Sequence, residues 1–123
     1  MNYAELITEA NLSFASNNFT MSLDKAKEAI KSQPKESEGY YCAGKACMSM
    51  DQPNEAVGYF KKATEIDKIN GNGYFLLGYA QIMSDDTVGA LKSLTRALET
   101  NCESVLKGQI YKMMSMINTD QAD

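Results

Sequence analysis

The sequence predicts an all-α fold in which three antiparallel helix-turn-helix units stack one after another and a further helix closes the stack. Two similar segments, "GYYCAGKACMSMD" at 39–51 and "GYFLLGYAQIMSD" at 73–85, align along their whole length when the chain is shifted against itself. Within each segment the apolar residues recur at helical spacing. The chain has 123 residues, 44% hydrophobic and 23% charged, which suits one soluble globular domain. Self-similarity at such a period is typical of stacked helical hairpins.

The shift between the segments, from position 39 to position 73, brings meaningful positions together. The eight residues that recur unchanged are Gly39, Tyr40, Gly44, Ala46, Asp51, Ala56, Ala63 and Glu65, which return as Gly73, Tyr74, Gly78, Ala80, Asp85, Ala90, Ala97 and Glu99. Phe60 returns as Leu94, which changes the shape of the side chain but not its polarity. The repeated residues therefore define a structural unit.

Each unit contains two helices joined by a turn. The residues Tyr40, Ala43, Gly44 and Cys47 have the spacing i, i+3, i+4, i+7 and predict the first helix (helix A). The residues Ala56, Phe60 and Ala63 have the spacing i, i+4, i+7 and predict the second helix (helix B). The turn "MDQPN" lies between them, and Pro53 suits the first position of helix B.

The small residues have a mechanical role in this scheme. Gly44 and Gly78 lie where helix A of a unit meets helix B, and a bulky side chain there would hold the two axes apart. Glycine costs about 1 kcal/mol relative to alanine inside a helix, so close packing has to offset that cost.

This pattern resembles the tetratricopeptide repeat, which has large, small and aromatic residues at fixed places within each repeating unit of the same length. Residues 37–70 match through Tyr40, Gly44, Ala56, Phe60 and Ala63, and residues 71–104 match through Tyr74, Leu77, Gly78, Ala90, Leu94 and Ala97. Gln81 departs from the family pattern, which usually has an aromatic residue there, and no proline lies near Lys68 or Cys102. The resemblance implies a right-handed superhelix of three repeats.

A degenerate first repeat is expected at residues 3–36. Its matching residues are Leu6, Ala10, Ser22, Ala26, Ala29 and Pro34. Ala26 is small for its place, but terminal repeats are often atypical because one of their faces meets solvent. We therefore expect a single domain over residues 1–123, with repeats at 3–36, 37–70 and 71–104.

The remaining residues, 105–123, are predicted to form a capping helix and a tail. An apolar stripe with helical spacing consists of Leu106, Ile110, Met113, Met114 and Ile117, and the polar run "NTDQAD" follows it. This helix is expected to cover the last hairpin, as solenoids require. The alternative is that its methionines mediate a homodimer.

The composition argues against catalysis, metals and cofactors. The sequence contains no histidine, and its three cysteines, Cys42, Cys47 and Cys102, form no C-x-x-C pair. A nucleophilic cysteine needs a base, and a zinc site needs clustered ligands. No phosphate-binding glycine loop is present. We therefore expect no enzyme activity, no catalytic residues, no metal and no cofactor, and we expect the cysteines to be buried in a reducing cytoplasm.

Nucleic acid and membranes are disfavoured as partners. The net charge is −4, and Arg96 is the only arginine among the twelve basic residues. Proteins that bind nucleic acid concentrate such residues on one face. No apolar run approaches the ~18 residues that a membrane span requires. The opening "MNYAELITEANLSF" has two acidic residues and no basic ones, unlike a secretory signal.

The resemblance implies that the A helices line an inner groove, which is the expected site. Counting along each repeat, the groove positions are Ile7, Asn11, Phe14, Tyr41, Lys45, Met48, Phe75, Tyr79 and Ile82. Ligand contact is favoured for Tyr41, Phe75 and Tyr79, since aromatic residues with polar tips suit interfaces. The alternative for Phe14, Met48 and Ile82 is packing between neighbouring A helices.

Members of this family that bind acidic C-terminal tails use a clamp of two lysines, two asparagines and an arginine. The corresponding residues here are Ile7, Asn11, Cys42, Asn72 and Leu76, of which only Asn11 agrees. We therefore expect no binding of a terminal carboxylate. The expected function is binding of an apolar, extended or helical segment of a partner protein. The alternatives are a secretion-type small chaperone and a scaffold that self-assembles through its C-terminal helix.

Overall fold

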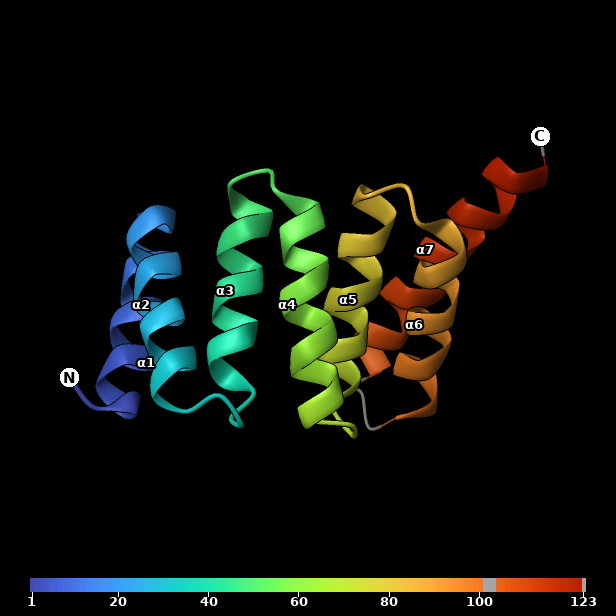
Figure 1. The fold of residues 1–123 in the computed structure, drawn as a ribbon. Coiled ribbons are helices and arrows are strands. Elements are labelled where there is room, and N and C mark those ends of the chain that lie inside the picture. The colour runs from blue at the N-terminus through green and yellow to red at the C-terminus, as the bar shows by residue number, and fades with distance from the viewer. Residues whose placement is uncertain (101–103, 123) are drawn as a thin grey trace.

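The fold is described from a computed structural model that defines residues 1–100 and 104–122, and the side chains of residues 1–100 and 106–117. Seven helices follow one another in this part of the chain: α1 Tyr3–Ala15, α2 Phe19–Ser32, α3 Glu38–Ser49, α4 Pro53–Ile66, α5 Gly71–Met83, α6 Thr87–Glu99 and α7 Ser104–Ala122. The first six form three antiparallel hairpins in a row, and the all-α prediction is confirmed (Figure 1). None of the described helices is long and apolar enough to cross a membrane.

The turn inside each hairpin repeats with the same period as the sequence. Asn17, Asp51 and Asp85, which occupy equivalent places in the three hairpins, all have positive φ angles of 57–65°. Asparagine and aspartate adopt this left-handed conformation more easily than other residues with a side chain. In each turn the next amide donates to a carbonyl five residues back at 2.8 Å, which closes the preceding helix in a Schellman-type cap. The recurrent aspartate is therefore a turn residue.

Helix starts follow ordinary capping chemistry. Asn2, Asn18, Asn70 and Asp86 each accept a hydrogen bond from a backbone amide three residues ahead. Pro53 occupies the start of α4, as predicted. These caps and turns fix the helix boundaries independently of packing between the hairpins.

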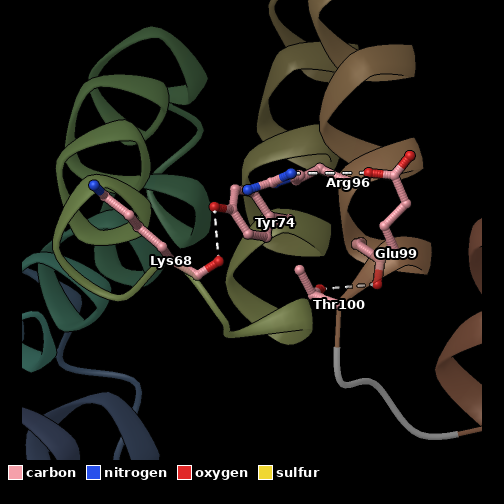
Figure 2. Close-up of polar contacts among 6 residues, drawn as sticks. Lys68, Tyr74, Arg96, Glu99 and Thr100 are labelled. Carbon is pink, nitrogen blue, oxygen red and sulfur yellow. Dashed lines mark hydrogen bonds and ion pairs between the residues drawn. The ribbon is translucent and has the colours of Figure 1, made fainter.

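A second hydrogen bond recurs between successive hairpins. Tyr40 Oη donates to the carbonyl of Pro34 at 2.9 Å. Figure 2 shows the equivalent bond of the next repeat, in which Tyr74 Oη donates to the carbonyl of Lys68 at 3.0 Å. Because the acceptor is a backbone carbonyl, the bond does not need the proline that the sequence lacks at position 68. The Arg96 guanidinium also lies over the Tyr74 ring, 5.7 Å from its centroid.

The core consists of three clusters arranged along the stack. The middle cluster contains the buried residues Cys47, Ala56, Phe60, Leu77 and Ala80. Helices α3 and α4 approach so closely here that a Cβ atom at Gly44 would lie 2.5 Å from Phe60 Cε1. In the next hairpin a Cβ atom at Gly78 would lie 2.8 Å from Leu94 Cδ2. Both glycines therefore have the packing role that the sequence predicts.

Replacing Gly44 by alanine should lower the free energy of unfolding, although alanine favours helix. The methyl group would overlap a buried ring, at a cost of about 1–3 kcal/mol, which exceeds the ~1 kcal/mol gained in helix propensity. Gly58→Ala in α4 is the matched control, since nothing lies within 4 Å of a Cβ atom there. That control should stabilise the protein by about 0.5–1 kcal/mol. Urea unfolding of both variants checks the prediction, and a stabilising Gly44→Ala would contradict it.

Two buried positions depart from the simplest repeat pattern. Gln81 is 4% exposed, and its Oε1 accepts a hydrogen bond from the Ser93 hydroxyl at 2.6 Å. This bond between α5 and α6 replaces the aromatic contact that the resemblance implies. Cys42 and Cys47 are buried, as expected, whereas Cys102 lies outside the described residues.

Helix α7 packs on the last hairpin through one face. Ile110 is fully buried and Ile117 is 4% exposed, and both belong to a cluster with Ala90, Leu94 and Ala97 of α6. The helix runs obliquely to the other six (Figure 1). It continues through Ala122, so the polar run that follows the apolar stripe is helical as far as this residue. No glycine or proline stands there to end the helix.

Candidate functional site

The candidate site lies on the surface formed by α1, α3 and α5, here termed the A-helix face. Two hollows indent this face. The polar hollow, of about 280 Å³, is lined by Asn11, Glu38, Tyr41, Cys42, Lys45, Asn70, Asn72, Gly73 and Leu76. The methionine hollow, of about 270 Å³, is lined by Met48, Ser49, Asp51, Pro53, Tyr79 and Met83. Both hollows are lined by residues of α3 and α5, and the two together are here termed the groove.

The hollows lie end to end because of the helical register. The polar hollow uses residues 38–45 of α3 and the first turns of α5, whereas the methionine hollow uses the last turns of both helices. An apolar lining is found at the methionine hollow, where Tyr79 is 43% and Met83 is 50% exposed. The polar hollow instead presents amide, ammonium and carboxylate groups. The A-helix face therefore combines two kinds of surface.

Of the nine residues that the sequence singles out, five line the hollows. They are Asn11, Tyr41 and Lys45 in the polar hollow, and Met48 and Tyr79 in the methionine hollow. Asn11, Lys45 and Tyr79 are exposed, and they occupy equivalent places on α1, α3 and α5.

The other four residues pack into the protein. Ile7 is 7% exposed and belongs to the first core cluster. The Phe14 ring stands edge-on to Phe19, with centroids 5.3 Å apart. Phe75 and Ile82 lie against the cluster that α7 shares with α6. This cluster includes Ile110 and Ile117 of α7, so the two side chains are partly buried where α7 packs on the last hairpin.

Several lining residues were not among the predicted positions. Glu38, Asn70 and Gly73 come from the first turns of α3 and α5, and Pro53 and Met83 come from the ends of hairpin turns. Asn72 and Leu76 could be found from the sequence only as clamp positions. These lining residues could have been predicted from the positions at which the A helices start, because the first turn of each A helix lies beside the neighbouring A helix.

Tyr41 shapes the floor of the polar hollow. Its ring packs so closely on Gly73 of α5 that a Cβ atom at that glycine would overlap the Tyr41 hydroxyl. The hydroxyl is buried and has no hydrogen-bond partner among the residues that the structure describes. Burial, followed by the charge of Asp67, raises the pKa of Tyr41 to about 12 from 10.0.

Tyr41→Phe should remove an alkaline loss of stability. The folded protein holds the Tyr41 proton to a higher pH than the unfolded chain does, so ionisation of Tyr41 does not change the free energy of unfolding below about pH 10. The free energy of unfolding falls as the pH rises from about 10 to about 12, because the unfolded chain loses this proton first. At pH 8 the variant should be more stable by about 1 kcal/mol, since an unpaired buried hydroxyl is removed. Urea unfolding at pH 8 and pH 11 measures both effects, with Tyr111→Phe, an exposed position, as the control. Equal alkaline losses in wild type and Tyr41→Phe would contradict this account.

The groove contains no activated nucleophile among the described residues. Burial raises the pKa of the Cys42 thiol, and the charge of Lys45 opposes that rise only in part. The Cys42 Sγ donates to Asn11 Oδ1 at 3.5 Å. Burial likewise raises the pKa of Cys47. A thiol kept protonated is a poor nucleophile, and the part of the chain that the structure describes has no cluster of three side chains able to hold a metal.

A larger depression of about 650 Å³ lies on α2, outside the A-helix face. Its walls come from α2 and the turn before it, and they include the ion pair between Lys25 and Glu28, 3.6 Å apart. A depression bordered by one helix and a paired charge offers a partner less enclosure than a groove between helices does. We therefore keep the A-helix face as the candidate site.

Comparison with solved structures shows what this arrangement of helices is. The chain superposes on the TPR2B domain of yeast Sti1, solved in a complex with pHsp70, with a TM-score of 0.87 and 23% identity, covering 96% of this chain and 97% of that one. This chain has the tetratricopeptide-repeat fold.

Two further structures share this tetratricopeptide-repeat fold. The type III secretion translocator chaperone SycD of Yersinia enterocolitica, solved with a peptide of the translocator YopD, matches with a TM-score of 0.89 and 14% identity over 96% of this chain and 93% of SycD. The first repeat domain of Spaghetti (RPAP3), solved with the HSP90 peptide SRMEEVD, matches with a TM-score of 0.91 and 15% identity over 99% of this chain and 94% of that chain. No family model matches the sequence, and no curated protein is similar to it in sequence.

Three of the five clamp positions of the tetratricopeptide-repeat fold are apolar here and are drawn towards the core. Ile7 and Cys42 are buried in the first cluster, and Leu76 packs against the second. Asn11 and Asn72 are exposed and line the polar hollow. The cation that remains at this end of the groove is Lys45.

Proposed function

We propose that this protein is a non-catalytic adaptor or chaperone-like module that binds a segment of a partner protein in the groove of the A-helix face. The observation that carries the proposal is the pair of adjoining hollows with Lys45, Tyr79 and Met83 exposed at them. Exposed aromatic and methionine side chains in a concave site are typical of peptide-binding surfaces. The peptide complexes of SycD, Sti1 and Spaghetti show that this fold can carry such a role.

The partner segment is expected to place an apolar side chain in the methionine hollow. That hollow is wide enough for one large side chain and is bordered by Met48, Tyr79 and Met83. Methionine adapts its shape to different apolar groups, so the hollow suits a family of related side chains. The polar hollow would contact the neighbouring backbone through its amide groups.

The test is a comparison of charge insertions inside and outside the groove. Peptides are selected from a display library on the wild-type protein, and their affinities are measured by fluorescence anisotropy. The variant Tyr79→Glu/Met83→Glu should weaken binding at least tenfold, because it places charges in the apolar hollow. Val88→Glu on α6, at a position 61% exposed and outside the groove, should leave binding within about twofold. Circular dichroism confirms that each variant folds.

The opposite pattern would overturn the proposal. If Val88→Glu weakens binding and the groove variant does not, the site lies on the B-helix side. If no peptide binds, the groove is not a peptide site.

The terminal carboxylate of a peptide that ends in Glu-Glu-Val-Asp should not contribute to binding. Spaghetti was solved with the peptide SRMEEVD, but the groove of this chain lacks the charges that would hold a terminal carboxylate. Ile7, Cys42 and Leu76 occupy three of the five clamp positions, and a buried apolar residue cannot pair with a carboxylate. Anisotropy with labelled SRMEEVD and with its C-terminal amide should give affinities that agree within about twofold at about 150 mM salt, where weak surface attraction is screened. Binding of the free acid at least tenfold tighter than that of the amide would show that other groups replace the clamp.

A further inference from the structure

Given the proposed function, on which this inference rests, Lys45 is the residue that sets the chemistry of the segment bound in the groove. This lysine is exposed, and it is the one basic residue that lines either hollow. The ion pairs found among the described residues join Lys25 to Glu28 and Arg96 to Glu99, so Lys45 has no acidic partner there. Its charge is therefore available to a ligand.

Lys45 lies at the end of the polar hollow nearest the methionine hollow. It lines the polar hollow, while Tyr79, its equivalent on α5, lines the methionine hollow. On α3, the first residue that lines the methionine hollow is Met48, three residues after Lys45. With a rise of about 1.5 Å per residue, Met48 lies about 5 Å along the helix axis from Lys45. A cation and an apolar recess are thus neighbours on one surface.

The groups around Lys45 are mainly hydrogen-bond donors. The Asn11 side chain uses its oxygen to accept from Cys42, which leaves its NH₂ group for a ligand. Asn72 is exposed on the opposite wall. The one acid of the polar hollow, Glu38, is seven residues from Lys45 on α3, about two helical turns away. The end of the polar hollow beside Lys45 is therefore suited to oxygen atoms that accept hydrogen bonds.

We infer that the groove recognises an extended segment with an internal aspartate or glutamate side chain one to three residues from a large apolar side chain. The carboxylate pairs with Lys45, and the apolar side chain enters the methionine hollow. An extended chain advances about 3.3 Å per residue, so the ~5 Å offset corresponds to between one and two residues. A single lysine suits a side-chain carboxylate, whereas the missing clamp disfavours the carboxylate of a chain terminus.

The experiment selects ten-residue peptides that are fixed in a carrier protein at both ends, so that no free terminus is available. Selection on the wild type should enrich acidic residues one to three places from Leu, Ile, Met, Phe, Tyr or Trp. Selection on Lys45→Glu should enrich Lys or Arg at the same place. Lys62→Glu, an exposed lysine of α4 outside the groove, is the control and should select the same acidic peptides as the wild type.

Affinities of individual pairs make the test quantitative. Each mismatched pair, Lys45→Glu with the acidic peptide or wild type with the basic peptide, should bind at least tenfold more weakly than the wild-type pair. The charge-reversed pair should recover to within about threefold. Such recovery isolates the interaction between the two exchanged charges.

The outcomes separate this inference from the proposed function. One outcome would overturn the inference and leave groove binding intact. In it, the selected peptides lose affinity for Tyr79→Glu/Met83→Glu, but they show no preference for acidic residues, or Lys45→Glu selects the same acidic residues as the wild type. Peptides insensitive to the groove variant, or no peptides at all, would overturn both.

Discussion

Replacing Phe60 by alanine should lower the free energy of unfolding by about 3–5 kcal/mol, the usual cost of removing a buried aromatic ring. Phe60 is fully buried in the middle cluster, and its ring fills the space beside Gly44. The alanine variant leaves a cavity between α3 and α4, and helices held apart by turns and caps cannot close on it fully. Urea unfolding monitored by circular dichroism measures the loss.

Phe60→Leu provides the matched comparison, because Leu94 has the equivalent place beside Gly78 in the next hairpin. It should cost clearly less than Phe60→Ala. In the Phe60→Leu background, Gly44→Ala should also cost less than in the wild type, since the branched side chain can yield to the added methyl. A loss below ~1 kcal/mol for Phe60→Ala would show that the middle hairpin is not held by this contact.

Ile110→Ala should be the second large effect, with a loss of about 2–5 kcal/mol. Ile110 is fully buried on α7, and it belongs to one cluster with Leu94 and Ala97 of the last hairpin. Removing it weakens the attachment of the capping helix and exposes the apolar side of α6 to water. In a linear repeat array such a loss at the end propagates to the neighbouring unit.

Tyr111→Ala is the control for the capping helix, because Tyr111 lies next to Ile110 in the sequence but is 61% exposed. It should change the stability by less than ~0.5 kcal/mol in a monomer. If Tyr111→Ala destabilises the protein as much as Ile110→Ala, and the loss depends on protein concentration, the outer side of α7 is an interface between copies of the chain.

The sequence predicts the architecture well because the features that set it are local and periodic. The glycines at 44 and 78, the turn residues Asp51 and Asp85, and Pro53 each act within one hairpin, so their spacing reveals their place. The end of α7 was not predictable in the same way, since polarity alone does not stop a helix that has no glycine or proline. The boundaries of the repeats as separate units stay a prediction.

The groove is only partly predictable, and the reason lies in packing between hairpins. Counting along a helix gives the side of the helix on which a residue lies, but not what the neighbouring helix covers. Tyr79 stays exposed, whereas Phe75, four residues earlier, packs against the cluster that α6 and α7 form. Residues from the first turns, such as Glu38 and Asn70, enter the polar hollow because α3 and α5 start side by side. That arrangement depends on contacts far apart in the sequence.

The central claim is that a partner segment lies in the groove of the A-helix face, and amide chemical shifts map it most directly. A selected peptide is titrated into the ¹⁵N-labelled protein, and the shift of each assigned amide is recorded. We predict that the largest shifts occur in α3 and α5, around Lys45, Met48, Tyr79 and Met83, with small shifts in α2, α4 and α6. Largest shifts on α2, α4 and α6, with α3 and α5 unchanged, would contradict the account.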